Sequence, residues 1–419
     1  MLVHWIWLAI RNHVSDRLKV ELVRHFQDPE TIYFADAESY GVVSGISTEG
    51  KAALADKNLQ EAENILRLCR RKNLNILTFQ DAAYPARLKN ISDPPIVLYY
   101  KGRLPDFDAE PLIGVVGTRK ASAYGMNVAG KMGYQIARCG GIVVSGMASG
   151  IDAMATRGAL TANALAVGIL GCGADVIYPP ENRTLFEEME EYGCLISEYP
   201  PETPPLGRNF PKRNRIISGL SCGVLVVEAP ERSGALITAN AALDQGRDVF
   251  VVPGNIDVDT FVGSNRLLRD GAIAVSSGWD ILSEYEAQYP DKIHPENSPA
   301  TQTAYPDEVL KVASEVEKPA VNREKTAKKS LLKEKLKKEP EKKAIDKEPP
   351  RPYIDLNDTL SKLSPDEKAI VTNLKDGERL VDDVIAETGM TTGKLLATLT
   401  MLELKGIIRR HPGKRISLK

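Results

Sequence analysis

The chain has 419 residues, and at roughly 100–200 residues per domain this length predicts about two to four domains. Hydrophobic residues make up 43% of it and charged residues 26%, and 54 Lys and Arg against 56 Asp and Glu leave a formal net charge of -2. No apolar run approaches the roughly 18 residues that a bilayer-spanning helix needs, and the five cysteines are widely spaced without a CxxC pair. These features exclude fibrous, membrane-spanning and disulfide-rich secreted proteins, and they predict a protein of the reducing cytoplasm without a zinc site.

The first part of the sequence, residues 1–108, has mostly helical periodicity. The apolar start Met1–Ile10 lacks a basic leader region and a cleavage site, so we expect a first packed helix rather than a signal peptide. Apolar residues recur at helical spacing over Glu49–Arg71, Leu74–Phe79 is typical of a short strand, and Gly41–Ile46 predicts a hairpin between two helices. These patterns predict a small helical domain of the SAM or helix-hairpin-helix kind, with packing or nucleic-acid binding as its two alternative roles.

Residues 109–286 change to alternating apolar strands and helices. Continuous apolar strands mean that both faces of the sheet are covered, which is typical of an α/β fold with a Rossmann-like, doubly wound, mostly parallel sheet. Ligands in this architecture bind beyond the carboxyl ends of the strands. The expected strands are Leu112–Val116, Gly141–Val144, Ala164–Leu170, Leu195–Ser197, Val224–Val227, Val249–Val252 and Ala272–Val275, and the expected helices include Tyr124–Arg138, Ile151–Leu160 and Ala235–Gln245.

Residues 287–355 predict a disordered, charged linker. Between Arg323 and Arg351 the sequence has twelve Lys or Arg, six Asp or Glu and almost no aromatic residues. Such a segment has too little apolar surface to fold alone.

The last part, residues 356–419, predicts a winged-helix domain. Ser364-Pro-Asp-Glu367 is a capping sequence that begins a first helix, Leu380–Thr388 and Thr391–Lys405 predict two more, and Ile407–Leu418 is typical of a hairpin. The hairpin is basic enough to contact phosphates, but the expected recognition helix offers few polar side chains. DNA contact and protein docking are therefore both open.

Two loops that follow expected strands have the composition of phosphate-binding turns. Small residues let a backbone approach an anion, and free N–H groups at a helix start favour one. The alternative is a plain strand-to-helix turn. The candidate residues are Gly117, Thr118, Arg119 and Lys120 in the first loop, and Ser145, Gly146, Ser149 and Gly150 in the second.

A third segment, Gly207–Arg215, has four basic residues, one phenylalanine and no acidic residue. Cations that follow a phosphate backbone, together with an aromatic platform for a base, are typical of single-strand binding. The alternative is a solvated helix start, but cations there oppose the helix dipole, so their clustering favours a ligand. The candidate DNA-binding residues are Arg208, Phe210, Lys212, Arg213 and Arg215.

No catalytic constellation is evident in the sequence. None of the five histidines lies within residues 109–286. Gly125–Lys131 matches a P-loop pattern, but it is expected inside a helix and the hydroxyl residue that should follow it is absent. Asp152, Glu198 and Glu228 stand near strand ends and are expected to be hydrogen-bond acceptors in loops. The sequence therefore predicts a binding protein with no catalytic residue, no metal and no cofactor.

Several segments of residues 111–284 closely resemble the DprA/Smf family of bacterial DNA-processing proteins, in the order in which the family has them. The helical front and the winged-helix tail resemble the family's flanks more loosely. The segments are Gly114–Arg119, Ser145–Asp152, Phe210–Ser221, Ser233–Ala239, Val252–Asn255 and Gly263–Leu268.

This resemblance implies a protein of natural transformation that binds incoming single-stranded DNA, forms a homodimer through the Rossmann-like domain and loads the RecA recombinase without catalysis of its own. It implies a phosphate contact for Arg119, and it places Phe210, Lys212 and Arg213 in the family's basic-aromatic segment. Some members have a lysine three residues before the phenylalanine, where this chain has Gly207.

Two alternative functions come from other classes. A nucleotide-binding hydrolase of the lysine-decarboxylase-like group would carry a catalytic glutamate in a PGGxGTxxE motif, and the comparable stretch Pro230–Thr238 lacks it. A regulator would read DNA with its winged helix and sense a nucleotide with its sheet. Deletion of everything after the sheet domain distinguishes this regulator from a recombination mediator, that is, a protein that binds single-stranded DNA and loads RecA. The shortened mediator should still bind DNA, whereas the shortened regulator should not.

Overall fold

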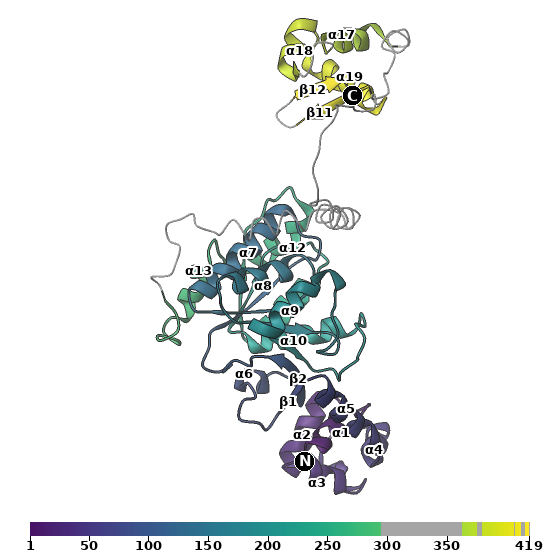
Figure 1. Cartoon of the computed structure of the whole chain (residues 1–419), viewed down its shortest axis with the longest axis vertical. Coiled ribbons are helices and arrows are strands. Elements are labelled where there is room, and N and C mark those ends of the chain that lie inside the picture. The colour runs from purple at the N-terminus through teal and green to yellow at the C-terminus, as the bar shows by residue number, and fades with distance from the viewer. Residues whose placement is uncertain (295–362, 375–378, 406, 412–414, 419) are drawn as a thin grey trace, which may run out of the picture. The chain divides into compact units, whose positions relative to one another are not determined.

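The computed structural model describes residues 1–294, 363–374, 379–405, 407–411 and 415–418 (Figure 1). The chain divides into two compact units, Met1–Lys329 and Ser330–Lys419, and each is described by itself. Most of the predicted linker, residues 295–355, lies outside the described residues. No helix in the described part of the chain is long and apolar enough to cross a membrane.

The first unit begins with short helices: α1 Leu2–Ala9, α2 Asp16–Phe26, α3 Pro29–Phe34, η1 Ser39–Val42, α4 Thr48–Ala55 and α5 Gln60–Arg71. The hydroxyl oxygens of Ser15 and Ser47 cap α2 and α4 by accepting from the backbone N–H three residues further on. The predicted hairpin at Gly41–Ile46 is wrong. The 3-10 helix η1 ends at Val42, and a turn at Ser44 and Gly45 without strands leads to α4; Tyr40, just before this segment, is fully buried and donates to the carbonyl oxygen of Ile32 at 2.9 Å.

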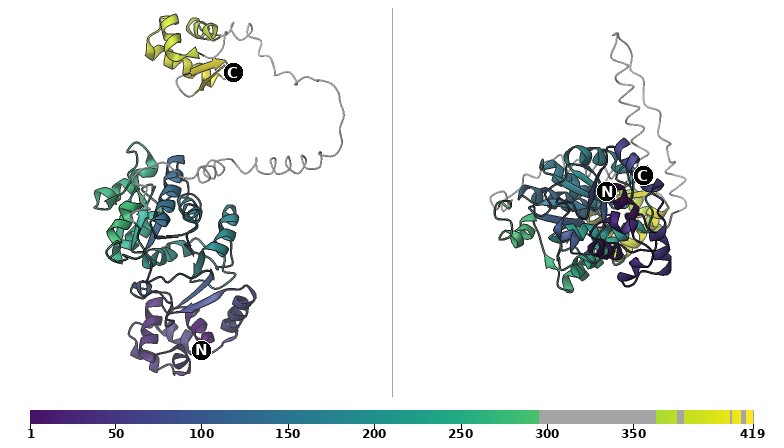
Figure 2. Two further views of the ribbon diagram at one scale, coloured as in Figure 1. Left: turned by 60° about the vertical axis from the view of Figure 1, so that its left-hand side comes forward. Right: turned by 90° about the horizontal axis from the view of Figure 1, so that it is seen from below.

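The described residues of this unit also form a nine-stranded sheet, with the strand order β1-β2-β6-β5-β4-β3-β7-β8-β9. The strands are β1 Asn75–Thr78, β2 Val97–Gly102, β3 Leu112–Val116, β4 Ile142–Ser145, β5 Ala166–Leu170, β6 Cys194–Ser197, β7 Gly223–Val226, β8 Asp248–Val251 and β9 Ile273–Ala274. From β6 to β9 every neighbouring pair is parallel, which confirms the predicted doubly wound sheet. The antiparallel strands β1 and β2 extend it towards the N-terminal helices (Figure 2), and β2 was not predicted.

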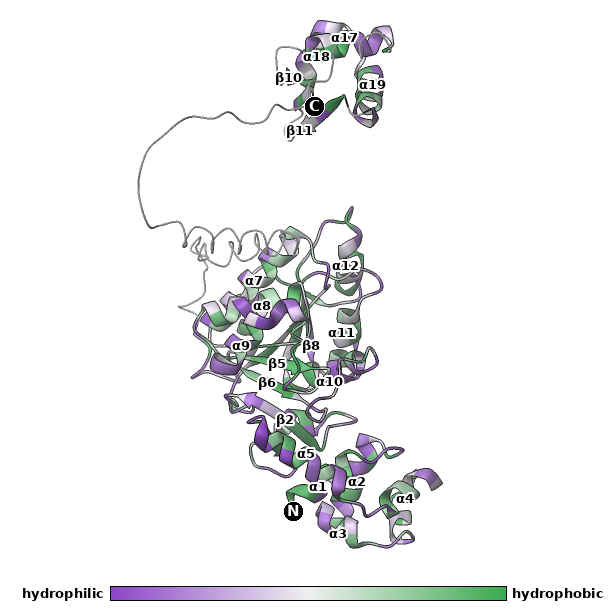
Figure 3. Ribbon diagram, turned by 45° about the vertical axis from the view of Figure 1, so that its right-hand side comes forward, coloured by the Kyte–Doolittle hydropathy of each residue, from purple (hydrophilic) through white to green (hydrophobic). Residues whose placement is uncertain are grey.

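Helices cover both faces of the sheet. Figure 3 shows α7, α8 and α9 on one side and α10, α11 and α12 on the other, as a doubly wound sheet requires. The strand order reverses between β3 and β7, and such a switch point is where these sheets bind ligands. The helices are α6 Ala86–Lys89, α7 Ala123–Arg138, α8 Ile151–Thr161, η2 Pro180–Asn182, α9 Arg183–Tyr192, α10 Asn209–Leu220, α11 Gly234–Asp244, η3 Asp259–Phe261, α12 Val262–Arg269, α13 Gly278–Leu282 and η4 Ser283–Tyr285.

The second unit has the predicted helices and hairpin of a winged helix. Its elements are α17 Pro365–Asn373, β10 Arg379–Leu380, α18 Val381–Thr388, α19 Thr392–Leu404, β11 Ile408–His411 and β12 Arg415–Leu418. Ser364 and Glu367 form the expected capping box. Ile370, Leu395, Leu399, Leu402 and Ile416 are fully buried, so this unit has a core of its own.

Gly133 of α7 and Gly158 of α8 let these two helices approach each other closely, and this contact gives a first prediction. A Cβ at Gly158 would overlap the carbonyl oxygen of Gly130. We expect Gly158→Ala to destabilise the first unit by about 1–3 kcal/mol, although alanine is the better helix former. The matched control is Gly234→Ala in α11, where a Cβ would meet nothing within 4 Å. Thermal unfolding followed by circular dichroism measures both variants, and an unchanged midpoint for Gly158→Ala would contradict the prediction.

Candidate functional site

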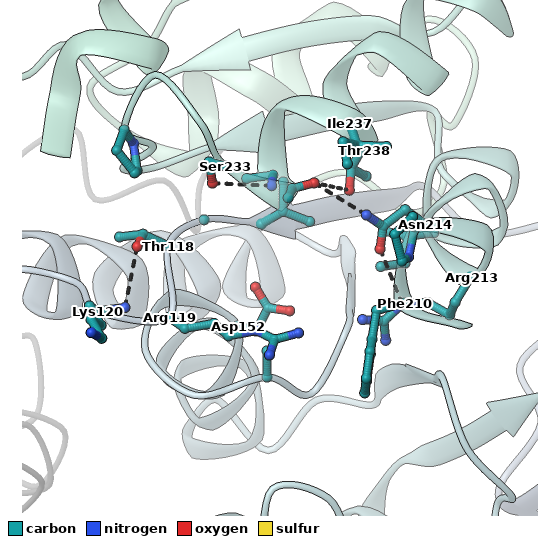
Figure 4. Close-up of a pocket in the computed structure, with 18 of the residues that line it drawn as sticks. Thr118, Arg119, Lys120, Asp152, Phe210, Arg213, Asn214, Ser233, Ile237 and Thr238 are labelled. Carbon is teal, nitrogen blue, oxygen red and sulfur yellow. Dashed lines mark hydrogen bonds between the residues drawn. The ribbon is translucent and has the colours of Figure 1, made fainter. Parts of the chain in front are cut away.

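A cavity of about 710 Å³ opens at the carboxyl ends of β3 and β7, where the strand order reverses. The three predicted segments meet here: Gly117–Lys120 follows β3, Ala148 comes from the loop after β4 and Asp152 from the first turn of α8, and Phe210 and Arg213 come from α10. Figure 4 shows the labelled side chains around this space. The start of α11 completes the wall, and the sequence analysis did not predict it.

Phe210 lies between basic groups in the cavity wall. The guanidinium carbons of Arg119 and Arg213 lie 5.1 Å and 6.0 Å from the centre of its ring, within range of cation–π attraction. The Tyr178 ring lies 5.3 Å from the Phe210 ring and also lines the cavity. The predicted combination of an aromatic platform with cations is therefore present in this wall.

Three exposed cations, Arg119, Lys120 and Arg232, line the same cavity. Among the described residues, none of the three has a carboxylate oxygen within 4.0 Å. Unpaired cations at the mouth of a cavity attract an anion even in a chain whose net charge is -2. Arg232 was missed by the sequence analysis, although a basic residue just beyond a central strand is the kind of signal used for Arg119.

Arg213 has a structural task as well as a place in the wall. Its side chain is buried, and its Nη1 donates to the carbonyl oxygens of Gly146, at 2.7 Å, and Ile169. Burial lowers the pKa of Arg213 to about 10, and the nearby carboxylate of Asp152 opposes this shift. Burial in turn raises the pKa of Asp152, while Arg213 and backbone N–H groups act in the opposite direction. Arg213 thus ties α10 to the ends of β4 and β5.

The space beside the glycines of the predicted phosphate loops is occupied by other atoms of the protein. A Cβ at Gly117 would overlap Ile151, one at Gly146 would overlap the Arg213 guanidinium, and one at Gly150 would overlap the carbonyl oxygen of Thr118. Gly150 also has a φ of +75°, which favours glycine. Their small size serves the packing of the loops, which is a different reason from close approach to a phosphate.

Carboxylates occupy the helix starts where a Rossmann sheet usually holds a pyrophosphate. The buried Glu228 carboxylate accepts from the backbone N–H of Ser122 at 3.1 Å and from its hydroxyl at 2.8 Å, at the start of α7. Asp152, in the first turn of α8, accepts from the Gly146 N–H at 3.1 Å. A dinucleotide would bring its negative charge against these carboxylates, so the arrangement disfavours one at α7 and α8.

Lys212 and Arg215 do not line the cavity. Lys212 Nζ lies 2.8 Å from an Asp16 oxygen and 3.2 Å from a Glu198 oxygen. Arg215 is buried and pairs with Asp16, with Glu198 and with Asp93. Both predicted residues therefore point from α10 towards the N-terminal helices.

The remaining predicted residues are divided between the surface and the interior. Arg208 is exposed next to the cavity without lining it. Ser145 is buried and donates to the carbonyl oxygen of Val115 at 2.9 Å. Gly146 and Ser149 line a neighbouring cavity of about 230 Å³ behind Phe210, where the Ser149 hydroxyl donates to Glu181 at 2.8 Å.

Two family models match the chain. A model described as DNA recombination-mediator protein A matches residues 75–286, and the DprA winged helix domain matches residues 355–414. Protein Smf from Synechocystis sp. is 33% identical over 98% of this chain and 97% of its own length. The DNA processing protein DprA from Bacillus subtilis is 44% identical over 52% of this chain and 74% of its own length.

A solved structure agrees with these sequence relatives. The X-ray structure of DNA processing protein A from Streptococcus pneumoniae matches with a TM-score of 0.61 and 30% identity, covering 68% of this chain and 98% of that one. The sheet, the front domain and the tail thus point to one family. The chain belongs to the DprA/Smf family of DNA processing proteins.

Proposed function

We propose that this chain binds single-stranded DNA in the cavity between β3, β7 and α10, and that it acts there as a recombination mediator. In this role it protects incoming strands and loads RecA during natural transformation, in the cytoplasm. The observation that carries the proposal is the set of unpaired cations that line the cavity, Arg119, Lys120 and Arg232, together with the Phe210 ring beside Arg119.

The shape and charge of the cavity favour a single strand over a duplex. Cations bind phosphates of any sequence, and an aromatic ring stacks on any base that is free of its partner. In a duplex the bases are paired and stacked inside, so they do not reach a recessed ring such as that of Phe210. We therefore expect binding that depends on salt and hardly on sequence.

Binding without catalysis fits the carboxylates at the cavity better than hydrolysis does. Asp152 accepts a hydrogen bond from the backbone of the loop before α8, and Glu228 accepts one from the backbone of the loop before α7. Each carboxylate is engaged in holding a loop, which leaves neither placed as a general base. This supports a mediator over the nucleotide-binding hydrolase.

The winged helix supports the mediator over the regulator for a different reason. Lys394, in the first turns of α19, lies 2.8 Å from Asp366, and Lys405 at the end of α19 lies 2.7 Å from Glu367. These pairs reduce the positive potential that α19 presents to a phosphate backbone. We propose that the first unit is the main DNA-binding part.

The first prediction for this function concerns Arg119. Arg119→Ala removes a cation from the cavity and a partner from the Phe210 ring, so we expect single-strand affinity to fall by about tenfold or more. The slope of log affinity against log salt should become shallower by about 0.7 for the lost phosphate contact. Anisotropy of a labelled oligo-dT across a salt series measures both. Arg17→Ala, which removes an exposed cation of α2, is the control, and equal affinities for both variants would refute the site.

A second prediction separates mediator from regulator. A truncated chain of residues 1–294 keeps the whole cavity and lacks the winged helix. We expect its single-strand affinity to stay within about threefold of the full chain, a change below about 1 kcal/mol. Loss of all binding in a folded truncated chain would instead favour the regulator.

A third prediction concerns the homodimer that we propose for the sheet domain. Strand β9 ends the sheet in the described part of the chain, and Ile273 and Ala274 are both exposed on it. Such an edge offers free backbone groups and an apolar side chain to a second copy. Light scattering should show a dimer for the natural chain and a monomer for Ile273→Asp. A dimer that persists in this variant would place the interface elsewhere.

A further inference from the structure

Helix α10 presents different residues to two neighbours. Phe210 and Arg213 are three residues apart and face the cavity, whereas Lys212 and Arg215, also three apart, face the N-terminal helices. Because both pairs lie on one helix, a shift of α10 that displaces Lys212 or Arg215 also displaces Phe210 and Arg213. Helix α10 therefore links the cavity wall to the N-terminal helices.

Asp16, the first residue of α2, makes this connection. Its Oδ2 lies 2.8 Å from Lys212 Nζ and 3.2 Å from Arg215 Nη2, and its side chain is only 13% exposed. Lys19 lies 3.5 Å from the other carboxylate oxygen and donates to the carbonyl oxygen of Ala9 at 2.6 Å. Asp16 is thus held by Lys19 within α2 while it contacts two residues of α10.

The other hydrogen-bond partners of Arg215 fix the orientation of its guanidinium. Its Nη1 and Nη2 donate to the two carboxylate oxygens of Glu198 at 3.0 Å and 2.9 Å, and its Nε donates to Asp93 at 2.9 Å. A planar guanidinium with partners on each side fixes direction as well as distance. The Arg215 and Glu198 side chains are 9% and 5% exposed, so little water is available to replace a lost partner.

We propose that Asp16 is a positioning residue for the DNA cavity: through Lys212 and Arg215 it sets the first turns of α10, and with them the Phe210 ring and the Arg213 guanidinium. The inference rests on the proposed function of this cavity. The N-terminal helices are then part of the DNA site without touching DNA, and displacement of α2 changes DNA affinity.

Direct electrostatics predicts the opposite sign for the same substitution. Asp16→Asn removes a negative charge near a cationic cavity and frees Lys212 for a phosphate, so charge alone would strengthen binding. Positioning predicts weaker binding, because α10 loses one of its anchors, the one that joins it to α2. It also predicts an unchanged salt slope, because no phosphate contact is lost.

The experiment compares single-strand affinity across a salt series for the full-length natural chain and its variants. We expect Asp16→Asn to bind about five- to tenfold more weakly, a typical size for coupling between linked sites. Glu21→Gln removes the same charge from an outer position of α2 and should change nothing, and Asp16→Glu should restore part of the affinity. Lys212→Gln should weaken binding with an unchanged slope, and the double variant Asp16→Asn with Lys212→Gln should be no weaker than the worse single variant.

A second readout needs no DNA. Hydrogen–deuterium exchange of residues 209–216 should quicken in Asp16→Asn and stay unchanged in Glu21→Gln. Unchanged exchange in Asp16→Asn, equal or tighter DNA binding by it, or a shallower salt slope for Lys212→Gln would each overturn the positioning role. If exchange quickens in Asp16→Asn but the natural chain binds no single-stranded DNA, the proposed function alone is overturned.

Discussion

The guanidinium of Arg213 joins helix α10 to the ends of two central strands, and the shape of the cavity follows from that attachment. A buried cation must keep its partners, because an unpaired buried charge costs several kcal/mol. Arg213 finds them in the carbonyl oxygens of Gly146 and Ile169, near the Asp152 carboxylate. Since α10 cannot slide along the sheet without breaking these contacts, the Phe210 ring stays beside Arg119 and Tyr178. The wall is preorganised, which reduces the ordering that ligand binding requires.

The same physical logic explains how a Rossmann-like sheet is directed away from dinucleotides. The start of α7 normally offers free N–H groups to a pyrophosphate. Here Glu228 reaches that place from the end of β7 and accepts from Ser122. Gly125 leaves room for this carboxylate, since a Cβ there would overlap it. The anion position at the start of α7 is thus already filled, whereas the cations Arg119, Lys120 and Arg232 remain unpaired in the cavity wall.

The sequence predicted the buried strands well, because a strand covered on both faces must be a continuous apolar run. It missed β2, which mixes tyrosines and a lysine along Val97–Gly102. It also predicted a hairpin at Gly41–Ile46, where the chain forms the end of η1 and a turn at Gly45 but no strands. For the site, composition identified the cationic segment Gly207–Arg215, but it did not predict which of its side chains face the cavity. Only the helical period and acidic residues outside α10 decide that Arg213 and Lys212 face different neighbours. Those acidic residues, Asp16 among them, lie up to 199 positions away in sequence, beyond any local pattern.

The cluster of Asp16, Lys212, Arg215 and Glu198 joins α2 to α10 within the first unit, and stability alone does not explain why this contact is ionic. Well-packed apolar side chains of similar volume often give equal or greater stability than buried ion pairs. Charges differ from apolar contacts in their directionality, because a two-pronged guanidinium bond is satisfied in one orientation only. An apolar joint tolerates small rotations of α10, whereas the Arg215 joint does not. Because Phe210 and Arg215 lie on the same helix, a rotation of α10 would also move the Phe210 ring. The ionic joint therefore suits a boundary across which the orientation of a binding helix has to be maintained.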